Sequence, residues 1–165
     1  MGQKISAIER IPWTPTAVAD TTNATDTGYH AVQGGVSTQR STIREVYMGG
    51  VATASAPSQM LLGRDSVVGA TLSVGLAVVI DGSAVLIANP PVCFNTATTK
   101  PQRSSTLVLL ALAFNAFGGI VRWVAAPGEE ATLYGAAASV GECSLTAYTG
   151  GTPGLMQSHI LLETE

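Results

Sequence analysis

Few residues in this chain have the types and spacing that catalysis needs. The only histidines are His30 and His159, so side chains that titrate near neutral pH are scarce. Glu129 and Glu130 resemble a carboxylate pair, but adjacent strand residues point to opposite faces and would not converge on one substrate. Because they follow Pro127-Gly128, we interpret them as part of a solvated turn. The sequence has no nucleophile elbow and no glycine-rich nucleotide-binding motif. We therefore expect a protein that is not an enzyme.

The cysteines and the adjacent charge pairs favour structural roles. Cys93 and Cys143 are far apart, and the sequence contains neither a CxxC nor an HxxxH pattern. A zinc site is therefore not expected, and no other metal or cofactor is indicated. We interpret both cysteines as buried thiols, with a disulfide between them as the less favoured alternative. Arg44-Glu45 and Arg64-Asp65 are interpreted as surface or interface ion pairs.

The composition indicates a protein whose surface is largely covered by other subunits. Of the 165 residues, 46% are hydrophobic and 12% are charged, whereas about 25% are charged in an ordinary soluble domain. Such a composition is unlike that of a disordered chain. The 8 lysines and arginines are scattered, so a nucleic-acid surface is not expected. We therefore predict a homo-oligomer.

The most apolar segment, Leu107 to Val121, is shorter than the ~20 residues that a membrane-spanning helix needs, so no membrane partner is expected. Within it, residues 107–116 are apolar at both odd and even positions. A strand of this kind must be covered on both faces, and a neighbouring subunit would supply the second cover most easily. A buried helix is the alternative, because leucine and alanine are good helix formers. The β-like segments on either side favour the strand.

Residues 1–35 are predicted to form an extended N-terminal arm. Pro12 and Pro15 fix their own φ angles and keep the residues before them out of the helical region. Trp13 between them would fill a pocket on a neighbouring molecule or fold back onto its own domain, and both possibilities stay open.

Residues 36–165 are predicted to form one domain of short strands. Asp81-Gly82 is a strong hairpin signal, with 84–88 as its return strand, and 94–102 is predicted to be a loop. The predicted all-β fold is an antiparallel β-sandwich or jelly roll with an extended N-terminal arm. Its other strands are expected at 42–48, 66–80, 107–116, 120–124, 131–134, 142–148 and 155–163.

Arg122 is a single charge within an apolar run, next to Trp123. A buried arginine needs a partner, which a carboxylate across a subunit interface would supply. The alternative is an exposed face of an amphipathic strand, and both remain open. Our candidate interface residues are Trp13, Arg122 and Trp123.

Four segments of the chain resemble small structural proteins of tailed bacteriophages and prophages. They are Phe114–Glu130, Tyr148–Ile160 with its Gly150-Gly151-Thr152-Pro153-Gly154 turn, Glu45–Gly50, and Gly63–Ser66. The resemblance implies a virion component, specifically a capsid decoration (cement) protein with a jelly-roll core, and it brings no catalytic residues.

The resulting prediction is a homotrimer on the outer capsid surface of the virion that binds the major capsid protein and stabilises the shell. The net charge of −3 suits a component outside the shell, away from packaged DNA. The alternative is the trimeric head of a fibre or spike that binds a host receptor through an exposed loop, with 94–103 or 49–59 as the candidate loops.

Overall fold

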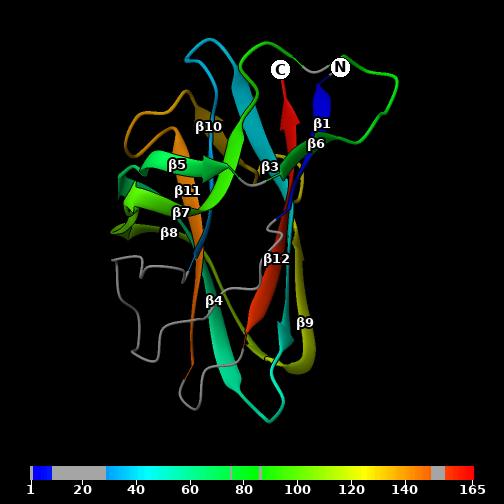
Figure 1. Cartoon of the computed structure of the whole chain (residues 1–165), viewed down its shortest axis with the longest axis vertical. Helices are drawn as coiled ribbons and strands as arrows, with labels where there is room; N and C mark the ends of the chain where they lie inside the picture. Colours follow the sequence, from blue (N-terminus) through cyan, green and yellow to red (C-terminus); the bar gives the residue numbers. More distant parts are fainter. Residues whose placement is uncertain (1, 9–28, 75, 86, 150–154) are drawn as a thin grey trace.

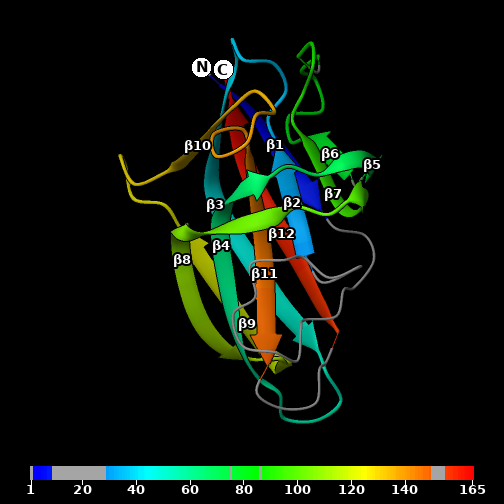
Figure 2. The same ribbon diagram turned by 90° about the vertical axis from the view of Figure 1, so that its left-hand side faces the viewer.

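The computed structural model describes the chain except residues 1, 9–28, 75, 86 and 150–154. The described residues form two six-stranded sheets that face each other as a sandwich (Figures 1 and 2). All strand pairs among them are antiparallel, and no helix occurs in this part of the chain. The predicted all-β, jelly-roll-like sandwich is therefore confirmed.

Each sheet draws its strands from distant parts of the chain. Sheet A has the order β10-β3-β12-β1-β6, and β9 also pairs with β3. Its strands are β1 (Gln3–Ile8), β3 (Arg40–Val51), β6 (Leu76–Val79), β9 (Phe117–Val124), β10 (Ala131–Tyr134) and β12 (Met156–Thr164). Sheet B has the order β5-β7-β2-β11-β4-β8. Its strands are β2 (Tyr29–Gln33), β4 (Pro57–Val67), β5 (Ala70–Val74), β7 (Val92–Thr99), β8 (Gln102–Asn115) and β11 (Glu142–Thr149).

The core lies between the sheets and follows from strand alternation. In β12, Met156, Ser158, Ile160 and Leu162 are buried, and the residues between them are more exposed. Strand β3 alternates in the same way, except that its pairing with β12 shifts register beside Leu161 and Leu162. The extra residue of this bulge lets Arg44 and Glu45 both lie at the surface.

The chain crosses from sheet B to sheet A along both flanks of the sandwich. On one flank β5 ends sheet B and β6 ends sheet A, and on the other β8 ends sheet B and β9 lies at the edge of sheet A (Figure 2). At the second flank the chain turns sharply between Asn115 and Phe117, so β8 and β9 run in opposite directions.

The prediction of an arm over residues 1–35 is wrong at both of its ends. Strand β1 lies between β12 and β6, and β2 lies between β7 and β11, so both are integral to the sheets. Both are extended, as the sequence predicts, but their backbone hydrogen bonds go to neighbouring strands. Residues 9–28, including Trp13, lie outside the described residues, and the arm stays a prediction there.

Four local predictions also need correction. Among the described residues of 84–88 no strand occurs. There the side-chain amide of Gln3 in β1 donates to the Val85 carbonyl (2.8 Å) and accepts from the Ile87 amide (3.1 Å). The predicted loop 94–102 is largely β7. The segment 57–67, for which no strand was predicted, is β4. The predicted strand 66–80 corresponds to the end of β4 followed by β5 and β6.

Candidate subunit interface

Strands β8 and β9 expose large apolar side chains along one flank of the molecule, here called the β8–β9 flank. Ile120 is 77% exposed, Phe117 57%, Val124 50% and Leu109 44%. Leu107 and Val108 are more than a third exposed as well. Exposed apolar side chains that gather in one region of a surface mark interaction sites. The strand predicted at 107–116 is confirmed, and the alternative helix is wrong.

The inner side of this flank is only partly closed. Leu110, Leu112, Phe114, Val121 and Trp123 pack against the core but remain partly exposed. Alternation explains the arrangement, because even-numbered residues of β8 point between the sheets while their neighbours point outward. The flank therefore exposes both the outer face of an edge strand and the margin of the core.

The corner that joins β8 to β9 is held by several hydrogen bonds. The Oδ1 of Asn115 accepts from the backbone amides of Ala56 (3.0 Å) and Phe117 (2.9 Å). The Ala116 amide donates to the Ala56 carbonyl (2.9 Å), and the Ala116 carbonyl accepts from Ala52 (3.2 Å). The direction in which β9 leaves β8 is thus fixed by the chain itself.

Arg122 lies on the exposed face of β9, next to the apolar surface. Its guanidinium donates to Glu45 Oε2 from Nη2 (2.9 Å) and Nε (3.2 Å), and it lies over the Tyr47 ring at 5.2 Å. Its side chain is 55% exposed. The exposed-face alternative is therefore correct for Arg122, and its carboxylate partner belongs to the neighbouring strand of the same chain. The Tyr47 ring in turn stacks on His159 at 5.6 Å.

The structure brings two of the three predicted interface residues to the β8–β9 flank. Trp123 points inward and packs at the margin of the core, while Arg122 points outward. Trp13 lies outside the described residues. The contact of any of them with another subunit stays a prediction.

A buried carboxyl pair lies on the outer face of sheet B, which the sequence did not reveal. Asp65 and Glu142 are fully buried, and the charge of Glu142 acts on Asp65. Ser144 donates to Asp65 Oδ1 (2.6 Å), and the Gly69 amide donates to Glu142 (2.9 Å). Burial raises the pKa of both carboxyls, and the nearby Arg103 opposes this rise for Asp65.

The predicted pairing of adjacent charges is wrong, because the partners lie across strands. Arg64 donates to the carbonyl of Thr132 (2.8 Å) and not to Asp65. Arg44 binds Glu163 (2.8 Å) and Glu130. The turn at Pro127-Gly128 is confirmed by a hydrogen bond from the Glu129 amide to the Ala126 carbonyl (2.9 Å).

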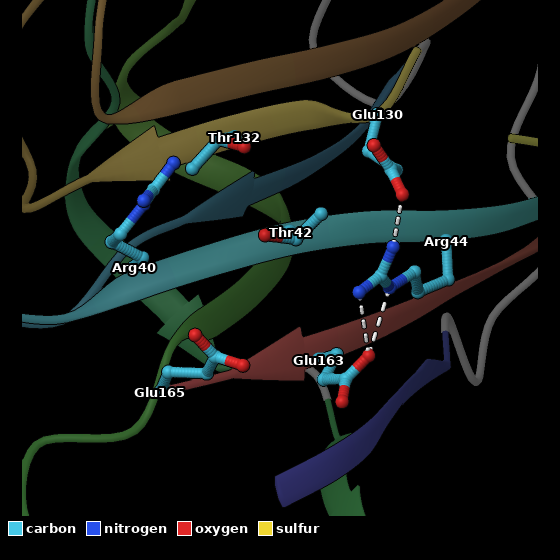
Figure 3. Close-up of a pocket in the computed structure, with 7 residues that line it drawn as sticks. All are labelled: Arg40, Thr42, Arg44, Glu130, Thr132, Glu163 and Glu165. Carbon is cyan, nitrogen blue, oxygen red and sulfur yellow. Dashed lines mark hydrogen bonds and ion pairs between the residues drawn. The ribbon is translucent and has the colours of Figure 1, made fainter. Parts of the chain in front are cut away.

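A polar pocket of about 210 Å³ lies on the outer face of sheet A (Figure 3). The ion pairs of Arg44 with Glu130 and Glu163 cross its centre, and Arg40 stands at its edge over the Tyr134 ring (5.3 Å). The charged groups at the centre are already engaged in ion pairs with one another, since Arg44 is shared by two carboxylates. No histidine, cysteine or lysine is among the lining residues, which are Arg40, Thr42, Arg44, Glu130, Thr132, Glu163 and Glu165.

The cysteines have the environment that the sequence predicts. Cys93 and Cys143 are buried, and no disulfide joins them. In the part of the chain that the structure describes, no three side chains from His, Cys, Asp and Glu gather where they could hold a metal ion. Likewise, none of the described segments forms a helix that is long and apolar enough to cross a membrane.

Comparisons with known proteins give only distant likenesses. No protein-family model and no curated protein matches the chain. Among solved structures, the virus-like particle of the extra small virus of the giant freshwater prawn Macrobrachium rosenbergii is similar with a TM-score of 0.31 and 6% identity, over 95% of this chain and 79% of that one. The VP2 subviral particle of infectious bursal disease virus has a TM-score of 0.18 and 13% identity, over 99% of this chain and 40% of that one. Likenesses at these TM-scores carry no argument about function.

Proposed function

We propose that this chain is a structural protein of a virus particle, and specifically a capsid decoration protein. It acts as a homo-oligomer, with a trimer as the expected form, on the outer capsid surface, where it binds the major capsid protein. The observation that carries the proposal is the β8–β9 flank, where Leu109, Phe117 and Ile120 are largely exposed in the single chain. Each Å² of apolar surface that association removes from water contributes about 25 cal/mol to the binding free energy. A ring of subunits that contacts several shell subunits at once binds the capsid much more tightly than one subunit would.

Two other observations support an assembly role. Only 12% of the residues are charged, which is low for a surface that faces water on all sides. The segments that resemble tailed-phage structural proteins include Phe114–Glu130, which contains all of β9 and the corner before it. The polar pocket on sheet A offers no comparable support for catalysis, since its central charged groups are engaged in ion pairs with one another.

The test uses capsids assembled from the major capsid protein of the virus or prophage that encodes this chain. The purified chain should bind these capsids stoichiometrically and raise their resistance to heat, measured by co-sedimentation and by release of packaged dye. Replacing Ile120 with glutamate should weaken self-association at least about tenfold, because a charge would be buried without a partner.

Val85 provides a matched control for the same substitution, because it is 89% exposed and lies away from the β8–β9 flank. Val85→Glu should leave self-association and capsid binding unchanged. A chain that binds host cells and ignores capsids would favour the receptor-binding head. A chain that stays monomeric and binds neither would contradict the assembly role itself.

A further inference from the structure

The β8–β9 flank carries two open strand edges as well as apolar side chains. Of the strands that the structure describes, β4 alone pairs with β8 and β3 alone pairs with β9. The outward edges of both strands therefore present backbone donors and acceptors to which no described strand is paired. An open edge of this kind is a template for pairing with a strand of another chain.

Strand β8 has few of the devices that protect the edges of monomeric sheets. Its pairing with β4 shifts register between Gln102 and Leu110, but it is regular from Leu110 to Asn115. Such edges are normally short or interrupted by charged residues and prolines. β8 is 14 residues long, and after Arg103 it contains neither a charge nor a proline. The single charge of β9, Arg122, is already paired with Glu45. Neither edge thus opposes strand addition by electrostatic repulsion.

The two edges are suited to each other in direction and in chemistry. β8 and β9 run in opposite directions along the same flank (Figure 2). A second copy, rotated about an axis parallel to this flank, therefore presents its β9 antiparallel to the β8 of the first. Such a rotation keeps each residue at its height above the corner at Ala116. The outward side chains of Ala111 and Ala113 of one copy would then lie beside Ile120 of the next, and Leu107 and Leu109 beside Val124, so apolar side chains meet apolar side chains.

We propose that β8 of one copy pairs antiparallel with β9 of the next copy, so that sheet B of one subunit continues into sheet A of its neighbour. This inference rests on the homo-oligomer of the proposed function and names its contact. Because the contact joins two different edges, it is heterologous and closes into a ring when the rotation permits. Pairing of β8 with β8 across a two-fold axis would instead leave Phe117 and Ile120 of β9 uncovered.

Paired cysteine variants test the contact directly. Ala113→Cys and Ile120→Cys, which lie within one residue of the same height above the corner, are made separately and together. They are treated with a short bifunctional maleimide, which tolerates a register slip of one residue pair. The native thiols of Cys93 and Cys143 are buried and do not compete. Mixing the two single variants should give a cross-linked dimer, whereas either single variant alone should give none. The double variant should give a ladder that ends at the size of the ring.

The outcomes separate this inference from the proposed function. Efficient cross-linking of Ala113→Cys alone, ending at the dimer, would show a two-fold β8–β8 contact and overturn the proposal. An oligomer in sedimentation that yields no cross-link with any of the variants would also overturn it, while leaving the oligomer in place. A monomer in sedimentation would refute both this contact and the oligomer. Val85→Cys combined with Ile120→Cys is the negative control, and unchanged thermal unfolding confirms that each variant folds.

Discussion

Two buried groups are expected to oppose each other in the pH dependence of stability, and single substitutions should reveal both. We predict that the free energy of unfolding changes little between pH 7 and pH 5 in the unmodified chain. Over the same interval it should rise by about 2 kcal/mol in His30→Asn and fall by about 2 kcal/mol in Asp65→Asn.

Proton uptake by His30 in the unfolded chain destabilises the folded protein in acid. Its side chain is buried between the sheets, where Nδ1 lies 2.8 Å from the Ser158 hydroxyl. Burial, with a smaller effect of His159, lowers the pKa of His30 to about 3. In the unfolded chain the imidazole has a pKa of about 6.5 and takes up a proton as the pH falls below that value. Stability is therefore present above pH 6.5 and is lost toward pH 3, at up to about 1.4 kcal/mol per pH unit.

Asp65 has the opposite effect and stabilises the folded protein as the pH falls. Burial, reinforced by the charge of Glu142, raises the pKa of the Asp65 carboxyl to about 8. Unfolded, the same carboxyl has lost its proton above about pH 4. Between these values the folded state holds the extra proton, so stability falls as the pH rises and grows as the pH falls. From pH 7 to pH 5 His30 and Asp65 each contribute about 2 kcal/mol with opposite sign, and the raised pKa of the neighbouring Glu142 acts in the same direction as that of Asp65. The opposing contributions therefore largely offset each other.

Urea unfolding at pH 7.0, 6.0 and 5.0, at one protein concentration, measures these slopes. Asparagine suits both positions, because it mimics the Nδ1 side of histidine and a protonated aspartate without titrating. His159→Asn is the matched control. Burial also lowers the pKa of His159, but its side chain is half-buried, so its substitution should change the slope less than that of His30. Parallel stability curves for the unmodified chain, His30→Asn and Asp65→Asn would refute the reasoning.

Two further substitutions and one labelling experiment test the packing. Gly50→Ala should destabilise the chain by at least about 2 kcal/mol in thermal unfolding, since its Cβ would lie 2.0 Å from the Ala116 carbonyl oxygen. Gly82→Ala, with nothing within 4 Å, should stay within about 0.5 kcal/mol of the unmodified chain, and equal losses would contradict this placement. Cys93 and Cys143 should react with a thiol reagent at pH 8 only as fast as the chain unfolds, because both are buried and burial raises the pKa of Cys143 to about 12. A burst of labelling in the native state would show that the thiols are accessible.

The sequence predicted strands from two kinds of pattern. Residues 142–148 alternate, and 42–48 and 107–116 are β-type runs bounded by turn residues or other β-like segments; the structure confirms strands at all three places. Strand β4 was missed because neither of its faces is consistently polar or apolar: Leu61, Leu62 and Gly63 are buried in succession. The prediction of a return strand at 84–88 was wrong for another reason. The Asp81-Gly82 turn signal is local, whereas the bonds from Gln3 that hold the segment come from the other end of the chain.

The candidate interface was easier to predict than the charge partners. A strand that is apolar at both odd and even positions needs cover on both faces, and this argument requires no knowledge of the topology. The partners of Arg44, Arg122 and Asp65 depend on which strands are neighbours. In sheet A the fold places β3 beside β9 and β12, and in sheet B it places β4 beside β11, although these strands are distant in the sequence. The adjacent residues Arg44-Glu45 and Arg64-Asp65 therefore gave the wrong pairings.

The rigid corner at Ala116 links the stability of the single chain to its capacity to assemble. Association is weakened whenever the contact surface must first be ordered. Here Asn115 and Ala116 are hydrogen-bonded to Ala52 and Ala56, and Gly50 packs closely against the backbone of Ala116. These contacts leave the backbone at the corner no space for a different conformation. Both edges of the β8–β9 flank are thus set before a second copy arrives. A substitution at Gly50, though it lies outside the flank, is therefore expected to weaken assembly more than its effect on folding alone would account for.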